Sequence, residues 1–113
     1  MKEGDIVTAY IPQSDLTFKK RPALLLKKLQ KYDDFIVCGI SSNIHQYIKG
    51  FDEIISKENE EFNNTGLMHD SVVRLGYLSV LPKERIVGAI GYISKELQNI
   101  LLKRLSNYLI TDM

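Results

Sequence analysis

The stretch KKRPALLLKKL, residues 19–29, places three consecutive leucines between two groups of cations and contains no acidic residue. Side chains of a strand alternate between its two faces, so three adjacent leucines predict a strand that is buried on both sides. Lys19, Lys20 and Arg21 stand directly before Pro22, where this strand is expected to begin. The stretch therefore predicts a buried strand with a basic patch at its entrance.

Further strand-like runs, rich in β-branched or aromatic residues, lie on both sides of this stretch. The predicted strands are residues 5–11, 22–29, 35–40, 71–78 and 85–91. A hairpin-length link, residues 30–34, joins the second strand to the third, whereas residues 12–20 form a longer loop. From Ser94, a favourable N-cap, leucines recur at the spacing of an amphipathic helix of about four turns. The pattern predicts a mainly β fold, an SH3-like barrel with a C-terminal helix.

Residues 41–70 form a polar middle section in which we expect a helical turn at most. Its acidic residues face a single nearby lysine, Lys57, so we expect the section to be solvated. The acids are Asp52, Glu53, Glu58, Glu60 and Glu61.

Composition and charge restrict the class of protein. The chain has 113 residues, 44% of them hydrophobic and 26% charged, and its formal net charge is +1. This length fits one domain, residues 1–113. A near-neutral protein does not coat nucleic acid non-specifically, so any nucleic-acid site must be a local patch.

Cysteine usage and apolar runs indicate the compartment. The single cysteine, Cys38, excludes an internal disulfide and a cysteine-based zinc cluster, and its apolar neighbours predict that it is buried. We see neither a signal peptide nor an apolar run long enough for a membrane span, so a cytoplasmic protein without membrane contact is expected.

Motifs for a metal, a phosphate-binding glycine loop or a serine nucleophile are absent from the sequence, so no metal or cofactor is expected. What remains is Arg21, Arg74 and the hydroxyl pair Ser41 and Ser42. On spacing alone, an arginine before a proline is most often surface cover. Arg74 lies among wall residues of its strand, so its guanidinium must leave at an edge or meet an anion. Two guanidinium groups and a hydroxyl can hold one phosphate and stabilise the extra charge of a phosphorane.

The two histidines, His45 and His69, lie in polar loops where a solvated side chain is the ordinary state. Either could act as acid or base on RNA. His45 follows Ser41 closely enough to contact a substrate. His69 is expected to stay in solvent, held there by Asp70.

Four ordered motifs resemble the PemK/MazF-like toxins of bacterial type II toxin–antitoxin systems. They are GDIV (4–7), KRPALLL (20–26), VCGISSN (37–43) and SVVRLGYLSVLPKERIVGAIGYIS (71–94). The resemblance implies the same barrel, a homodimer, and a sequence-specific, metal-independent endoribonuclease that inhibits growth by cutting single-stranded mRNA. Its products would carry 2′,3′-cyclic phosphate and 5′-hydroxyl ends. The resemblance also implies a cognate antitoxin, whose disordered tail folds into the RNA groove and with which such toxins bind DNA.

The resemblance assigns catalytic roles to three residues. Arg21 matches the family's catalytic arginine before proline, Ser41 stands where a threonine is usual, and Arg74 matches an arginine that some members use. The expected substrate contacts are Phe18, Lys19, Lys20, Ser42, Asn43 and His45.

Three departures from the family pattern affect the expected chemistry. Some members have an aspartate two residues after the arginine matched by Arg74, but this chain has Gly76 there. Gly39 replaces a common proline, and Asn43 replaces a glutamine. The candidate bases are then His45, His69, Asp15 or water. An alternative is therefore a catalytically degenerate barrel that binds antitoxin, RNA or protein, and a third interpretation is an unrelated SH3-like adaptor.

Assembly is suggested by apolar residues beyond Arg74. Tyr77, Leu78, Val80 and Leu81 form a run too apolar for an exposed edge, and the helix has more apolar positions than a small barrel covers. These features predict a symmetric homodimer with an RNA groove near its two-fold axis.

Overall fold

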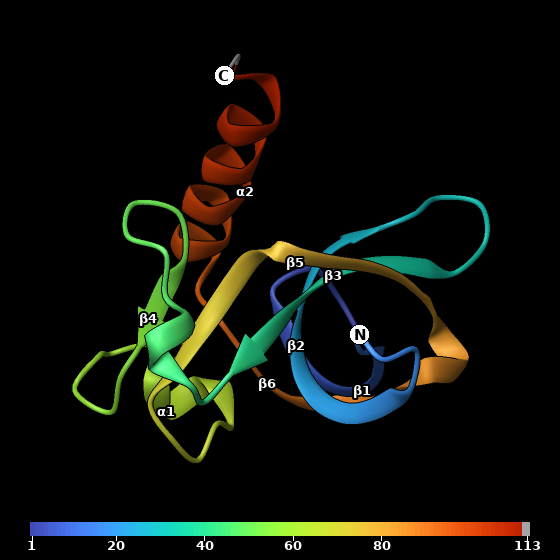
Figure 1. Cartoon of the computed structure of the whole chain (residues 1–113), viewed down its shortest axis with the longest axis horizontal. Helices are drawn as coiled ribbons and strands as arrows, with labels where there is room; N and C mark the ends of the chain where they lie inside the picture. The colour runs from blue at the N-terminus through green and yellow to red at the C-terminus, as the bar shows by residue number, and fades with distance from the viewer. Residues whose placement is uncertain (112–113) are drawn as a thin grey trace.

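The computed structural model describes residues 1–111, in which six antiparallel strands form one curled sheet beside a C-terminal helix (Figure 1). The strands are β1 (Asp5–Pro12), β2 (Phe18–Lys28), β3 (Asp34–Ser41), β4 (Glu53–Ile55), β5 (Ser71–Pro82) and β6 (Ile86–Tyr92). The helical segments are η1 (Ile44–Gln46), α1 (Phe62–Thr65), η2 (Lys83–Arg85) and α2 (Lys95–Ile110). The order across the sheet is β4-β5-β3-β2-β1-β6. The mainly β fold with a C-terminal helix is confirmed, and the sheet curls into a half-barrel.

β2 lies at the centre of the sheet, between β1 and β3, and its leucines are buried on both faces. Leu24 and Leu26 belong to a core between the sheet and α2, which also contains Leu101. Leu25 belongs to a second core inside the curl, with Val37. Full burial of one such side chain contributes about 1.5–3 kcal/mol to stability. The prediction of a strand buried on both sides is confirmed.

β5 changes direction in its middle, so that one strand covers both cores. Gly39 of β3 pairs with Arg74, but the neighbouring Cys38 pairs with Leu78, which leaves residues 75–77 without partners on β3. Extra residues of this kind bend a strand and increase its twist. The part of β5 before the bend packs in the core beneath α2, and the part after it closes the second core.

The loop predicted for residues 12–20 is wrong in its second half. Residues 18–21 already belong to β2 and pair with β1. On the other side, the ladder between β2 and β3 begins only at Ala23, opposite Gly39. Pro22, which has no N–H to donate, lies where this ladder ends. The basic residues therefore sit in a strand that has one open edge.

The middle section predicted to be solvated contains a short strand and a buried carboxylate. β4 pairs with β5 and places Ile55 in the core. The Asp52 side chain is buried at 2% exposure. Its carboxylate accepts hydrogen bonds from the N–H groups of Ile48 at 3.0 Å and Leu75 at 3.1 Å. These bonds replace water around the charge and tie the middle section to the bend of β5.

Cys38 is fully buried, as predicted. Burial, with a smaller effect from the charge of Asp52, raises the pKa of its thiol to about 12. The thiol therefore stays protonated at neutral pH and is not a nucleophile.

α2 packs on the sheet through Leu97, Leu101 and Leu105. Ser94 caps it as predicted, because its Oγ accepts a hydrogen bond from the N–H of Leu97 at 3.1 Å. The last turn projects away from the sheet (Figure 1), where Tyr108, Leu109 and Ile110 are 60%, 66% and 76% exposed. Within residues 1–111 there is no helix of the length and apolarity that a membrane crossing requires.

Tight packing of α1 on β6 requires glycine at position 91. A Cβ on Gly91 would collide with the backbone oxygens of Asn64 and Thr65. We expect Gly91→Ala to lower the free energy of unfolding by about 1–3 kcal/mol, the usual cost of overpacking. The measurement is urea denaturation.

Gly88 of the same strand provides the control. A Cβ there would meet no atom within 4 Å, so Gly88→Ala should change the free energy by less than about 0.5 kcal/mol. Equal effects of the two substitutions would contradict the close contact between α1 and β6.

Candidate active site

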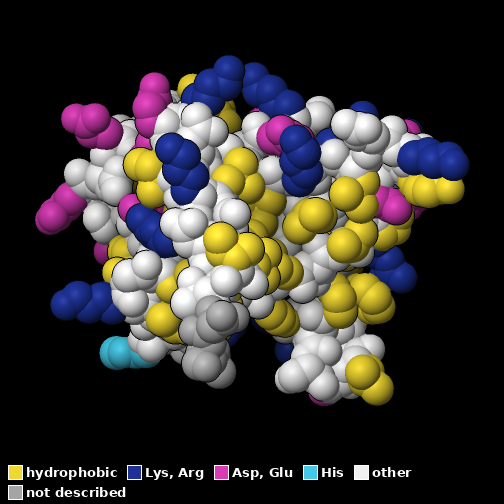
Figure 2. Space-filling view, turned by 90° about the horizontal axis from the view of Figure 1, so that it is seen from above, with side chains coloured by type: hydrophobic (Ala, Val, Ile, Leu, Met, Phe, Trp, Pro, Cys, Tyr) yellow, Lys and Arg dark blue, Asp and Glu magenta, His cyan; other side chains and the backbone are white. Residues whose placement is uncertain are grey.

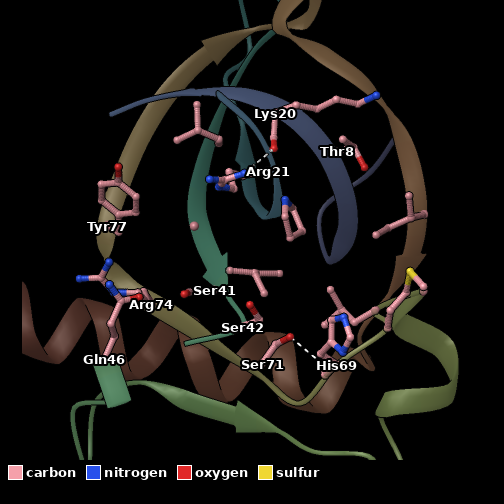
Figure 3. A pocket seen from close by; sticks show the side chains of 18 of the residues that line it. Thr8, Lys20, Arg21, Ser41, Ser42, Gln46, His69, Ser71, Arg74 and Tyr77 are labelled. Atoms are coloured by element: carbon pink, nitrogen blue, oxygen red, sulfur yellow. Dashed lines mark hydrogen bonds between the residues drawn. The ribbon is translucent and has the colours of Figure 1, made fainter. Parts of the chain in front are cut away.

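A groove of about 1070 Å³ opens inside the curl, beside the open edge of β2 (Figure 3). Its charged lining consists of Lys20, Arg21 and Arg74, together with the titratable His69. The lining contains no aspartate or glutamate. A concave surface with cations and no carboxylate favours an anionic ligand.

Strand register explains why three of the predicted site residues meet in this groove. Ala23 pairs with Gly39 in the β2–β3 ladder, so its continuation would place Arg21 opposite Ser41. Gly39 also pairs with Arg74 on the other side of β3. Residues two apart on a strand share a face, and diagonal neighbours are within reach of a long side chain. Arg21, Ser41 and Arg74 therefore lie on one face of three adjacent strands.

Within residues 1–111, neither groove arginine is paired with a carboxylate. The Arg21 side chain is exposed, and its Nη1 donates to the backbone oxygen of Lys20 at 3.3 Å. The salt bridges found in residues 1–111 involve Arg104 and three lysines, and none involves Arg21 or Arg74. Both guanidinium groups are free to bind an anion.

Arg74 is positioned by a tyrosine that we did not single out from the sequence as a site residue. The centre of its guanidinium lies 5.1 Å from the centroid of the Tyr77 ring, within cation–π range. The Tyr77 hydroxyl donates to the backbone oxygen of Pro12 at 3.0 Å, so this side chain also holds the end of β1.

Glycine at position 39 has a structural reason. A Cβ at Gly39 would lie 2.6 Å from Cδ2 of Tyr77, so the ring occupies the space that a side chain at position 39 would need. The missing side chain at position 39 is a sequence signal that could have pointed to Tyr77 as a neighbour.

Ser41 retains a hydroxyl proton for a ligand. Its Oγ accepts a hydrogen bond from the N–H of Asn43 at 3.0 Å, which uses a lone pair and leaves the O–H free to donate. The Asn43 side chain accepts from the N–H of His45 at 3.2 Å and thereby caps η1. Asn43 therefore shapes the turn and does not line the groove.

The structure brings together some predicted site residues and not others. Those lining the groove are Lys20, Arg21, Ser41, Ser42 and Arg74; those outside its lining are Phe18, Lys19, Asn43 and His45. Phe18 lies instead beneath Arg85, whose guanidinium centre is 3.8 Å from the ring centroid.

Both histidines are exposed, as expected for residues of polar loops. His69 lines the groove, whereas His45 does not. Asp70, expected to hold His69 in solvent, accepts a hydrogen bond from the N–H of Lys57 at 2.8 Å. Asp70 therefore joins two loops, and among the described residues no hydrogen bond links it to His69.

Asp15, another candidate base, is a weak one. Its carboxylate accepts hydrogen bonds from the hydroxyl of Thr17 at 2.6 Å and from the N–H of the same residue at 3.1 Å. These bonds lower the pKa of Asp15, and the residue lies outside the groove lining. In residues 1–111 there is also no cluster of three or more His, Cys, Asp or Glu side chains that could hold a metal ion.

Comparison with known proteins gives a family match and a fold match. A family described as "PemK-like, MazF-like toxin of type II toxin-antitoxin system" matches residues 2–109. The solved structure of Mycobacterium tuberculosis toxin MazF-mt6 is 21% identical, with a TM-score of 0.69 over 96% of this chain and 99% of that chain. A mycobacterial endoribonuclease in complex with its cognate antitoxin is 12% identical, with a TM-score of 0.72 over 100% and 98%. No curated protein sequence matches significantly.

Removing the Tyr77 hydroxyl tests whether it holds the end of β1. We expect Tyr77→Phe to lower the free energy of unfolding by about 0.5–1.5 kcal/mol, the net value of one hydrogen bond. Amide exchange in residues 13–17 should become faster, because Pro12 loses its anchor. Tyr92→Phe is the control, since Tyr92 is 50% exposed and should change neither quantity. Unchanged exchange in Tyr77→Phe would show that the loop is held by other contacts.

Proposed function

The chain belongs to the PemK-like, MazF-like toxins of type II toxin–antitoxin systems, and we propose that it cuts single-stranded RNA in the groove inside its sheet without using a metal ion. Members of this family act as endoribonucleases. The observation that carries the proposal is the groove itself, whose lining within residues 1–111 contains two guanidinium groups and the hydroxyl of Ser41 and no carboxylate. This arrangement suits one phosphodiester.

The chemistry proposed is an internal transfer at phosphorus. The ribose 2′-oxygen attacks the adjacent phosphorus and loses its proton, and the bond from phosphorus to the 5′-oxygen breaks as that oxygen takes up a proton. The products are a 2′,3′-cyclic phosphate and a 5′-hydroxyl. Arg21 and Arg74 stabilise the charge that develops on the phosphoryl oxygens, and Ser41 donates its hydroxyl proton to hold the phosphate in place.

Replacement of Arg21 tests its catalytic role. Loss of one contact to a developing charge costs about 3 kcal/mol, so Arg21→Ala should lower the cleavage rate of a short RNA by about a hundredfold or more. Arg21→Lys should also cut poorly, because a lysine cannot offer two parallel donors.

The control for Arg21 is another cation of the same strand. Lys27 is exposed, pairs with Glu3 at 3.5 Å and lies outside the groove, so Lys27→Ala should cut RNA at nearly the normal rate. A folded Arg21→Ala protein that cuts normally would remove Arg21 from the mechanism. A wild-type protein that binds RNA but never cuts it would favour the degenerate binding module, in line with Gly76 in place of the aspartate.

We also propose a homodimer, with a cognate antitoxin as the protein partner. Figure 2 views the molecule from the side on which α2 ends, and it shows hydrophobic side chains gathered near the centre of this face. Leu78 and Val80 of β5 are 39% and 58% exposed. The apolar side chains in the last turn of α2 are exposed as well. Leu81, expected on the same surface, is instead buried in the second core. The antitoxin proposal is supported by the similar mycobacterial endoribonuclease, which is in complex with one.

Charge substitution at one exposed valine tests the dimer. We expect the wild type to sediment as a dimer at micromolar concentration and Val80→Glu to sediment as a monomer, because a carboxylate in an apolar interface is left without a partner. Val87→Glu on the edge strand β6 is the control, because Val87 is exposed to nearly the same extent as Val80, 56% against 58%. A monomeric wild type would refute the dimer.

A further inference from the structure

The groove has a second wall that carries no fixed charge. Residues 66–69, between α1 and β5, line it together with Ile90 of β6. We call these five residues the far wall. Figure 3 shows His69 at the end of the cavity away from Arg74, with Ser42 between them. The far wall contains no lysine, arginine, aspartate or glutamate, so the groove has one cationic side and one side without a permanently charged side chain.

A glycine contact fixes the far wall against β6. Gly66 has φ = 74°, in the left-handed region that favours glycine. A Cβ on Gly66 would collide with the backbone oxygen of Ile90. Gly91, the neighbour of Ile90, approaches Thr65 just as closely. The backbone of the far wall is therefore packed directly on the strand behind it.

Hydrogen bonds fix the same segment from its N-terminal side. Glu61 accepts from both the N–H and the hydroxyl of Ser94, which joins the segment to the start of α2. The Thr65 hydroxyl donates to the backbone oxygen of Phe62 at 2.7 Å and accepts from the N–H of Leu67 at 3.1 Å. These contacts hold the far wall in one place before any ligand arrives.

The side chains of the far wall divide into an anchor and a free surface. Leu67 packs against the core beneath α2. Met68 and Ile90 are 79% and 42% exposed, and His69 is exposed as well. Exposed apolar side chains that share one wall of a groove, as Met68 and Ile90 do, favour a binding surface. Methionine sulfur and imidazole are both suited to contact with the flat face of an aromatic ring.

We propose that the far wall binds a nucleobase of single-stranded RNA while Arg21 and Arg74 hold the neighbouring phosphate on the opposite side, and that His69 and Met68 thereby select the base. The inference rests on the proposed RNA substrate. A nucleotide has one charged part and one flat, uncharged part, and the two sides of the groove match them. The groove volume of about 1070 Å³ reaches the upper end of ligand pockets, roughly 300–1000 Å³, and gives room for both parts.

The test is a binding measurement that does not depend on cleavage. Short 2′-O-methyl oligonucleotides of A, C or U alone cannot form a cyclic phosphate, so they report binding only. We expect the wild type to bind them with unequal affinity. His69→Ala and Met68→Ala should each weaken the tightest-bound oligonucleotide by about fivefold or more, as expected for loss of one stacked base, and so reduce the ratio of tightest to weakest binding. His69→Phe keeps an aromatic face and should retain a preference among the bases.

Two controls separate base contacts from other effects. His45→Ala removes the histidine that lies outside the groove lining and should leave all three affinities unchanged. Arg21→Ala should weaken all three by a similar factor, because phosphate contacts carry no base information.

The inference is overturned if the wild type binds the three oligonucleotides equally or not at all. It is also overturned if His69→Ala and Met68→Ala keep the wild-type ratios; weaker binding of a short acidic peptide by these variants would then assign the far wall to a protein partner. Base-selective binding that is lost in both variants supports the far wall even if the wild type cuts no RNA, in which case only the proposed cleavage fails.

Discussion

The ladder between β2 and β3 stops at Ala23 and Gly39, and the groove depends on where it stops. Beyond this point β2 continues for several residues against β1 alone, so its basic residues face an open space and not a neighbouring strand. Pro22 marks the end of the ladder because it cannot donate the next hydrogen bond. The same register leaves Arg21 and Ser41 facing each other across the opening.

The bend of β5 completes the site from the other side of β3. Arg74 lies immediately before the bend, and Tyr77, inside it, packs on Gly39 and contacts the guanidinium. The Asp52 carboxylate accepts a hydrogen bond from the N–H of Leu75 and thereby fixes the backbone of the bend. The net charge of the chain is only +1, yet the bend and the strand register gather cationic side chains on one concave surface whose lining contains no carboxylate.

The five longer strands and the helix could be predicted because each has a local periodicity, and the grouping of Arg21, Ser41 and Arg74 followed from the motifs that carry the family resemblance. β4 is three residues long, too short for periodicity to show. The burial of Asp52 gave no signal because its partners are backbone N–H groups of residues distant in sequence. The place of His69 in the groove depends on contacts of the 65–66 segment with Ile90 and Gly91, which no local pattern reveals.

The most direct test of the account is to incubate the purified protein with a long single-stranded RNA in EDTA and identify the new ends. The account predicts cleavage at a restricted set of sites, with 2′,3′-cyclic phosphate on one side of each cut and 5′-hydroxyl on the other. New ends that carry 5′-phosphate, cleavage that requires an added divalent cation, or no cleavage at all would contradict it.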